Sequence, residues 1–485
     1  MLFNSIQFLL FLPVVVLLYW LLPERWRLPM LLVASYGFYM SWMPLFILLI
    51  IPMTLFNWLW GDLLARSPKN AKLLLGLGVS ANLLTLGIFK YSDFVARSLG
   101  SLVGLATRHN PDWAIRIILP LGISFFTFEF IHYLFEIYRG QKPIKSFVLF
   151  ALFAAFFPTQ IAGPIKRFPD FAAQMLEKQK LQLSYFDQGI PLIVIGLAKK
   201  LLLADNLSIL VQMGLNQSSV FGAPETWLIA YAFTFQIYFD FSGYTDIARG
   251  SALLFGYHIP INFDTPYLAE NIADFWRRWH ISLSTWLRDY LFIPLGGSRS
   301  KRWATNRNLL ITMTLGGLWH GAAWNFVLWG VYHGFWLVVH REFVTWRQSL
   351  SIDAFKSFCE SRFYNLVSIV TTFNIVTIGL VIFRNQDLKI TGTMIKRMLL
   401  LSPIFTSAEE HHFLLLKPLL PVVVPVSITI VVLLLITNLP LSIANRTGYF
   451  RRMPAVLTAS YCAVLIFAMI TFLPDDSRPF IYFQF

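Results

Sequence analysis

Residues 316–324 read Gly-Gly-Leu-Trp-His-Gly-Ala-Ala-Trp, which places one histidine between glycines and tryptophans inside an apolar run that extends over 308–340. An ionisable side chain within a bilayer is costly, so it faces the protein interior and marks a candidate functional site. The glycines let backbones or a ligand approach closely, and Trp319 and Trp324 are expected to wall the histidine. His320 is therefore the first candidate for a reacting base. The alternative is a packed histidine that is hydrogen-bonded across helices.

The composition places the whole chain in a membrane. Of its 485 residues, 56% are hydrophobic and only 13% are charged, which is more apolar surface than a soluble core of this size can bury. The apolar runs are long enough to span as helices, and the strand alternation that a barrel needs is missing. We therefore predict an all-α polytopic membrane protein. The net charge of +14 comes mostly from short loops, as the positive-inside rule describes, rather than from a nucleic-acid-binding surface.

Loop charges predict the topology. We expect spans near 6–22, 28–40, 45–64, 73–89, 117–138, 190–215, 227–254, 364–383, 414–437 and 455–473. The first is expected to be retained, because neither a basic segment before it nor a cleavage site after it is present. The count places both termini outside and the polar, basic segment 257–307 in the cytoplasm. The stretch 147–162 has basic residues beyond both ends, which favours a re-entrant or interfacial segment beside an internal cavity.

The same count makes both ends of 308–340 cytoplasmic, so this run is predicted to be a hairpin or a broken re-entrant pair. Its first arm, 308–319, has about twelve residues and would extend roughly 18 Å, which is too short to cross. His320 is therefore expected to turn at membrane depth. We see no domain boundary and predict one membrane domain over 1–485, with its catalytic region at about 227–340.

A second dense stretch, 274–290, is interpreted as one helix. Trp276, His280 and Ser284 would share one face, and Arg277 would lie close to Arg288 on another. Local pairs are expected between Asp274 and Arg278, and between Arg288 and either Asp289 or the neighbours of Asp274. An amphipathic interfacial helix with tryptophan anchors is one interpretation. The other is a basic site for a phosphate-rich donor such as coenzyme A, for which the candidates are Arg277, Arg278, Arg288, Trp276 and Trp279.

Three further residues are candidates for lining a cavity. His333 either lines the same cavity as His320 or is a packed residue. Asp240 is expected to line a polar interior, whereas Asp246 and Arg249, three residues apart, suit a structural pair. No metal site is predicted, because adjacent side chains such as those in Glu-Glu-His-His at 409–412 rarely converge on one ion. The remaining histidines are expected in loops or as packed or interfacial residues: His109, His132, His258, His340, His411 and His412.

Several motifs occur together in one order along the chain. They are Leu-Gly-Ile-Ser-Phe-Phe-Thr-Phe at 121–128, Phe-Phe-Pro at 156–158 with Ile-Ala-Gly-Pro at 161–164, Asp-Phe-Ser-Gly-Tyr-Thr-Asp at 240–246, Asn-Phe at 262–263 with Pro-Tyr-Leu at 266–268, Phe-Trp-Arg-Arg-Trp-His-Ile-Ser-Leu-Ser at 275–284, Ile-Pro-Leu-Gly-Gly at 293–297, and Gly-Gly-Leu-Trp-His-Gly at 316–321. With these motifs the chain resembles the membrane-bound O-acyltransferase family, in its alginate O-acetyltransferase branch.

The resemblance implies a fold and an activity. The fold is a ring of about ten or more tilted transmembrane helices, with re-entrant helices, around a central tunnel. His320 matches the essential histidine of the family and His280 its second histidine near the tunnel. The implied donor is acetyl-CoA, without a permanently bound cofactor, and the implied partner is an extracytoplasmic SGNH hydrolase-like transferase. The implied location is the bacterial cytoplasmic membrane.

The last eight residues, 478–485, resemble the aromatic terminal motif of this branch. Tyr482 is therefore a candidate covalent relay for the acyl group, and the charge count places it outside; the alternative is an aromatic interfacial anchor. A transporter or flippase without acyl-transfer chemistry is the second hypothesis for the whole chain, and a scaffold for a partner enzyme is the third. Alginate, peptidoglycan, cellulose and other exopolysaccharides all remain open as the final acceptor.

Overall fold

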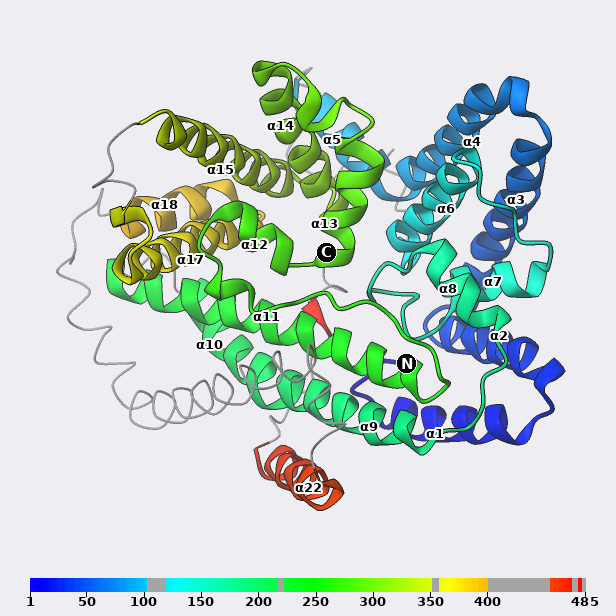
Figure 1. Cartoon of the computed structure of the whole chain (residues 1–485). Helices are drawn as coiled ribbons and strands as arrows, with labels where there is room; N and C mark the ends of the chain where they lie inside the picture. The colour runs from blue at the N-terminus through cyan, green and yellow to red at the C-terminus, as the bar shows by residue number, and fades with distance from the viewer. Residues whose placement is uncertain (103–118, 217–221, 351–356, 400–453, 473–478, 482–485) are drawn as a thin grey trace. The chain divides into compact units, whose positions relative to one another are not determined.

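The computed structural model describes residues 1–102, 119–216, 222–350, 357–399, 454–472 and 479–481. These residues are mostly helical (Figure 1), and the β-pairing among them is a single isolated bridge between Phe263 and Trp279. The predicted all-α fold class is confirmed.

The described residues form two compact units. Unit 1 comprises Met1–Ile193 and Thr245–Pro260, and unit 2 comprises Val194–Tyr244 and Ile261–Phe485. The chain passes from one unit to the other within α9 (Leu183–Ala198) and within α11 (Ala223–Leu253), and a third time between Pro260 and Ile261, in irregular backbone. The single membrane domain stays a prediction.

Unit 1 is built around α6 (Ile123–Tyr138), most of whose side chains are buried. The helix packs against α3 and α4. A buried ion pair links Glu129 of α6 to Lys166, whose Nζ lies 2.7 Å from the carboxylate. The other helical elements before α9 are α1 (Ile6–Leu21), α2 (Glu24–Met40), α3 (Ile47–Arg66), α4 (Ala71–Leu86), the π-helical η3 (Gly87–Tyr91), α5 (Ser92–Leu102), α7 (Phe147–Ala155) and α8 (Phe168–Leu176), with short 3-10 turns at Pro44–Phe46 and Pro68–Asn70.

The stretch 147–162 is part helix and part irregular backbone. Helix α7 ends at Ala155, and the buried turns that follow are bonded to protein groups. For example, the Phe157 N–H donates to Ser35 Oγ at 3.2 Å. Irregular backbone of this kind is compatible with a membrane interior only where protein or water satisfies it. That the stretch is re-entrant or interfacial, beside an internal cavity, stays a prediction.

Unit 2 contains the hairpin predicted over 308–340 as two packed helices, α14 (Arg302–His320) and α15 (Trp324–Ser349). A three-residue turn joins them, so the predicted hairpin is confirmed. Helix α17 (Arg362–Arg384) packs against α15. The remaining elements are η4 (Lys199–Ala204), α10 (Asp205–Asn216), η5 (Pro266–Leu268), α12 (Ile272–Arg278), α13 (Ile281–Leu287), η6 (Arg288–Phe292), η7 (Gly297–Arg299), α18 (Leu388–Met398) and α22 (Ala455–Thr471).

Two details of the prediction for this unit were wrong. Helix α14 begins at Arg302, because the polar residues before 308 continue the helix, and its 19 residues correspond to roughly 28 Å at 1.5 Å per residue. The short-arm argument for a turn at membrane depth therefore no longer holds. The predicted single helix over 274–290 is two helices, since His280 adopts a left-handed backbone conformation with φ of 43°.

Three described helical stretches are long and apolar enough to cross a membrane: 44–66, 68–100 and 362–384. They contain the spans predicted near 45–64, 73–89 and 364–383. Two shorter apolar helices, Ile6–Leu21 and Ala455–Thr471, correspond to the first and last predicted spans. The span predicted near 414–437 lies outside the described residues, as does part of the one near 117–138.

Candidate functional site

His320 is the last residue of α14 and adjoins the hairpin turn. Its half-buried imidazole lies among aromatic rings: the centroids of Trp319, Trp329 and Phe383 are 5.0, 5.1 and 5.3 Å away. Trp319 walls the histidine as predicted. The Trp324 side chain is 55% exposed at the start of α15.

The two arms of the hairpin approach closely because glycines face each other. A Cβ on Gly317 would lie 3.0 Å from the Cα of Gly330 and closer still to the Phe326 carbonyl oxygen. Carbon atoms prefer separations of about 3.5–4.0 Å, so this contact tolerates no side chain. The crossing brings Trp329 of α15 against the His320 ring.

His280 forms the corner between α12 and α13 and is completely buried. Asn262 stabilises this corner with two hydrogen bonds of 3.0 Å. Its backbone carbonyl accepts one from the Ile281 N–H, and its side-chain oxygen accepts the other from the Ser282 N–H. The His280 ring lies 4.7 Å from that of Phe241 and 6.4 Å from that of His320. Two histidines from separate stretches of the sequence therefore meet in one aromatic cluster.

His333 lies one helical turn beyond Trp329 on α15, and their ring centroids are 4.8 Å apart. Within the described part of the chain, three buried polar atoms in this group have no hydrogen-bond partner: Trp276 Nε1, Trp329 Nε1 and His333 Nδ1. Buried polar atoms usually have partners. These three atoms are therefore available for hydrogen bonds to a polar ligand or to water.

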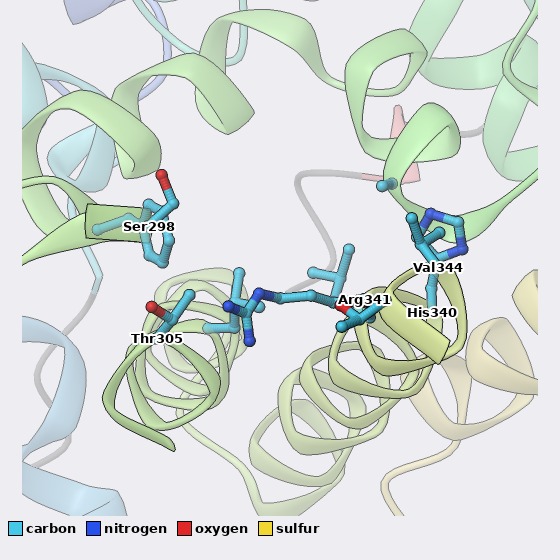
Figure 2. A pocket seen from close by; sticks show the side chains of 10 residues that line it. Ser298, Thr305, His340, Arg341 and Val344 are labelled. Atoms are coloured by element: carbon cyan, nitrogen blue, oxygen red, sulfur yellow. Dashed lines mark hydrogen bonds between the residues drawn. The ribbon is translucent and has the colours of Figure 1, made fainter. Parts of the chain in front are cut away.

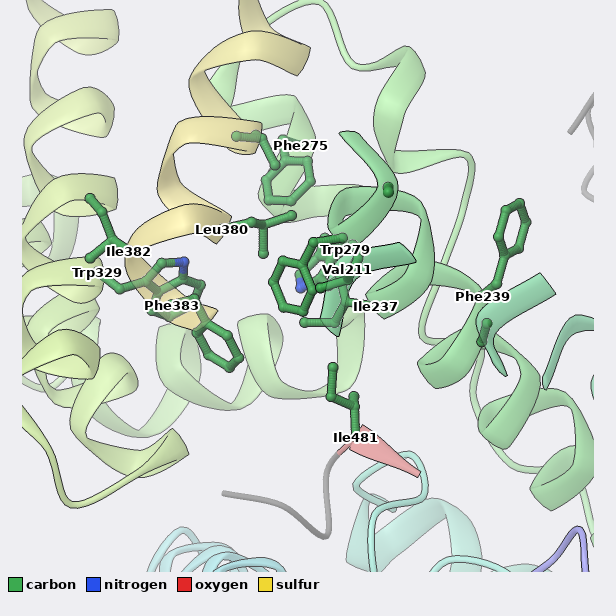
Figure 3. Close-up of a cluster of buried hydrophobic side chains, with 14 of the residues drawn as sticks. Val211, Ile237, Phe239, Phe275, Trp279, Trp329, Leu380, Ile382, Phe383 and Ile481 are labelled. Carbon is green, nitrogen blue, oxygen red and sulfur yellow. The ribbon is translucent and has the colours of Figure 1, made fainter. Parts of the chain in front are cut away.

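The aromatic group belongs to the main apolar core of unit 2, shown in Figure 3. Trp276 and Trp279, predicted to help bind a donor, are 8% and 6% exposed and lie in this core. Ile481, from the C-terminal segment, belongs to the same core.

The three candidate arginines are each paired with a carboxylate. Arg278 Nε lies 2.8 Å and Arg277 Nη2 lies 3.4 Å from Asp274. Arg288 pairs with Asp289 at 2.7 Å, a hydrogen bond that raises the pKa of Arg288. The two predicted local pairs are confirmed. The exposed side chains of Arg277 and Arg288 remain candidates for phosphate binding, and this role stays a prediction.

An open pocket of about 370 Å³ lies between residues of the segment 257–307 and the two hairpin helices (Figure 2). Its polar lining residues are Ser298, Thr305, His340, Arg341 and Thr345. The Arg341 side chain crosses toward α14 and donates to Asn306 Oδ1 at 2.6 Å. Neither this pocket nor Arg341 was predicted from the sequence, because no local motif marks them.

The two aspartates of α11 differ in their surroundings. Asp246 pairs with Arg249 at 3.6 Å, as predicted. Asp240 is buried and pairs at 2.9 Å with Lys200, which also contacts Asp205 at 2.7 Å. Sequence reasoning missed Lys200; a lysine pair, Lys199-Lys200, inside an apolar run was the available signal.

Of the other histidines, His132 and His258 belong to unit 1, and His340 lines the pocket of Figure 2. His132 is buried and accepts a hydrogen bond from the Phe168 N–H at 3.3 Å, so it is a packed residue. His258 is exposed. His109, His411, His412, with the neighbouring Glu409 and Glu410, and Tyr482 lie outside the described residues.

Comparisons with known proteins give the family. The sequence model of the membrane-bound O-acyltransferase family matches residues 125–383, which include His280, His320 and His333. The protein named probable alginate O-acetylase in Pseudomonas aeruginosa is 42% identical over 82% of this chain and 75% of its own. The peptidoglycan O-acetyltransferase of Helicobacter pylori is 32% identical over 100% of this chain and 98% of its own.

A teichoic acid D-alanyltransferase of Streptococcus thermophilus is 31% identical over 54% of this chain and 68% of its own length. The names of these relatives give the O-acetylation of alginate, the O-acetylation of peptidoglycan and the D-alanylation of teichoic acid. Because the family model covers more than half of the sequence and a relative above 30% identity spans it, the chain belongs to the membrane-bound O-acyltransferase family and is an O-acyltransferase.

Proposed function

We propose that this enzyme takes acetyl groups from cytoplasmic acetyl-CoA and passes them through the bacterial cytoplasmic membrane for O-acetylation of an extracellular polysaccharide. The observation that carries the proposal is the pair of histidines, 6.4 Å apart in an aromatic cluster. His320 is half-buried and His280 fully buried. One imidazole is thus accessible to a substrate while its neighbour supports the site from within.

His320 acts as general base in this proposal. It takes the proton of an incoming hydroxyl, whose oxygen attacks the thioester carbonyl. The new C–O bond forms as the C–S bond breaks, and the coenzyme A thiolate leaves and takes the proton back from the imidazolium. Proton and acyl group therefore balance without a further reactant.

His280 helps to position the donor or to polarise its carbonyl. Developing negative charge on that oxygen is stabilised by donors already aimed at it. The buried indole N–H groups of Trp276 and Trp329, which have no partner among the described residues, are further candidates for this task. His333, in the same group, would line the acyl path.

The donor enters from the cytoplasmic side. The pocket of Figure 2 is lined by residues of the segment predicted to be cytoplasmic and by one end of the hairpin. Its volume of about 370 Å³ is in the range of small-molecule sites. Arg277, Arg278 and Arg288 supply positive charge for the phosphates of coenzyme A. The family resemblance further implies a central tunnel within a ring of helices, for which Asp240, Asp246, Trp319 and Trp324 remain the lining candidates.

The hydroxyl that receives the acyl group is, in this proposal, the phenol of Tyr482. Its acetyl ester then passes to a hydroxyl held by an extracytoplasmic SGNH-like transferase, and the phenol regains a proton. The relatives named for alginate and peptidoglycan O-acetylation support a polysaccharide as the final acceptor. Family membership favours this chemistry over a flippase that moves cargo unchanged.

One experiment separates the two. Purified protein in vesicles is incubated with acetyl-CoA carrying a labelled acetyl group, and free coenzyme A and labelled protein are both measured. The proposal expects coenzyme A release together with label on the C-terminal peptide. A preparation that releases no coenzyme A overturns acyl transfer, and an active preparation with an unmodified Tyr482 overturns the relay.

A further inference from the structure

The end of the described chain contacts a buried charged group in unit 2. Lys200 of η4 lies between two carboxylates, Asp205 at 2.7 Å and Asp240 at 2.9 Å. The three side chains are between 1% and 4% exposed. Charges buried so completely are stable only when pairing and hydrogen bonds replace water. The groups that contact this charged trio therefore help to stabilise its burial.

The C-terminal segment supplies several of those contacts. The Ile481 N–H donates to Asp240 Oδ2 at 2.8 Å, the oxygen that does not face Lys200. Lys200 Nζ lies 3.5 Å from the Pro479 carbonyl oxygen and 4.7 Å from the ring centroid of Phe480. Both a charge-assisted hydrogen bond and a cation–π contact thus hold this segment.

The local helix geometry brings the trio together. Lys200 lies on a π-helical stretch, Lys199–Ala204, inside the long helix formed with α9 and α10, and such stretches are frequent at functional sites. Helix α11 approaches it closely at Gly243, where a Cβ would lie 2.7 Å from the Gly196 carbonyl oxygen. This close approach lets Asp240 of α11 reach Lys200.

One member of the trio, Asp240, is adjacent in sequence to a residue that contacts the histidine cluster. Asp240 directly precedes Phe241, whose ring contacts His280. Ile481 packs into the apolar core that contains Trp276, Trp279 and Trp329, and Figure 3 shows its side chain directed toward Ile237. The next residue in the sequence is Tyr482.

We propose that Lys200, Asp205 and Asp240 form a binding site for the protein's own C-terminal segment. The site recognises the backbone of 479–481 and the ring of Phe480, and so fixes the point from which Tyr482 is presented. Its recognition of the segment stands independently of the chemistry; its role as a positioning site rests on the proposed acyl relay.

Hydrogen exchange in the full-length protein without acyl donor tests the binding step. The Ile481 amide is expected to be protected in the wild type. Asp240→Ala is expected to raise its exchange rate by about tenfold or more, the effect of losing a hydrogen bond to a charged group. Asp246→Asn, a carboxylate change on the same helix, is the matched control and should leave the rate unchanged.

A second variant guards against misfolding of the first. Phe480→Ala leaves the charged trio untouched and removes only the ring over Lys200, so faster exchange at Ile481 is expected again, with Phe480→Trp restoring protection. An unprotected Ile481 amide in the wild type overturns the inference, and so does unchanged protection in both Asp240→Ala and Phe480→Ala.

Activity measurements test the positioning role. Phe480→Ala should lower the rate at which Tyr482 gains acetyl while the KM for acetyl-CoA stays the same, and Phe480→Trp should restore the rate. A rise in KM with an unchanged maximal rate contradicts positioning. A protected segment without acetyl on Tyr482 defeats the relay but not the binding site, whereas acetylation with an unprotected segment defeats the binding site alone.

Discussion

Replacing Gly317 by alanine should displace the hairpin arm that carries His320. The added Cβ would lie 3.0 Å from the Gly330 Cα, against a preferred carbon separation of about 3.5–4.0 Å. The Phe326 carbonyl oxygen would lie closer still to this Cβ, whereas a carbon–oxygen contact is ordinarily about 3.3–3.6 Å. The helices must therefore move apart by roughly 1 Å or more. Overpacking of this size costs about 1–3 kcal/mol. Misplacement of a reacting group by ~1 Å lowers the rate by on the order of 100-fold.

The assay is the initial rate of coenzyme A release at saturating acetyl-CoA, with thermal unfolding followed in parallel. Gly392→Ala is the control, because Gly392 lies on helix α18 of the same unit and a Cβ there meets nothing within 4 Å. It should be neutral or slightly stabilising. Normal activity and stability in Gly317→Ala would show that the close crossing does not position His320.

Two more predictions concern buried polar contacts. Lys166→Met leaves Glu129 buried without its 2.7 Å partner and should lower the free energy of unfolding, measured by chemical denaturation, by about 3–5 kcal/mol. Adding Glu129→Gln should recover part of this loss. If the losses of the two single variants simply add in the double variant, the pairing is contradicted. Asn262→Ala removes the side-chain acceptor for the Ser282 N–H, so it should lower the free energy of unfolding by about 1–3 kcal/mol and slow acyl transfer. Asn262→Asp keeps an acceptor and should retain more stability. Equal stability of the two variants would show that the Asn262 side chain does not support the backbone corner at His280.

The hairpin around His320 was predictable because its evidence is local. Apolar length, loop charges and a costly histidine are all properties of neighbouring residues, and they gave the helix pair and its turn. The start of α14 was not predictable, because the helical residues before 308 are mostly polar and lack the apolar pattern that marks a membrane span. Helix content alone does not reveal where such a helix begins.

The corner at His280 shows what local pattern cannot supply. The periodicity of residues 274–290 suits a single helix. The helix is interrupted at His280 because Asn262 and Asp264, more than ten residues away, make hydrogen bonds to the backbone on either side of it. The same holds for Asp240. Its partner Lys200 is 40 residues away and its hydrogen-bond donor Ile481 is 241 residues away, so only the folded chain brings them together.

The most direct test of the central claim is the acetyl-transfer rate of His320→Ala from labelled acetyl-CoA, measured on protein that elutes and unfolds like the wild type. His258→Ala is the matched control, since that side chain is exposed and belongs to unit 1. The account predicts that transfer is abolished in His320→Ala and kept in His258→Ala. A folded His320→Ala protein that transfers acetyl at a near-normal rate would contradict it.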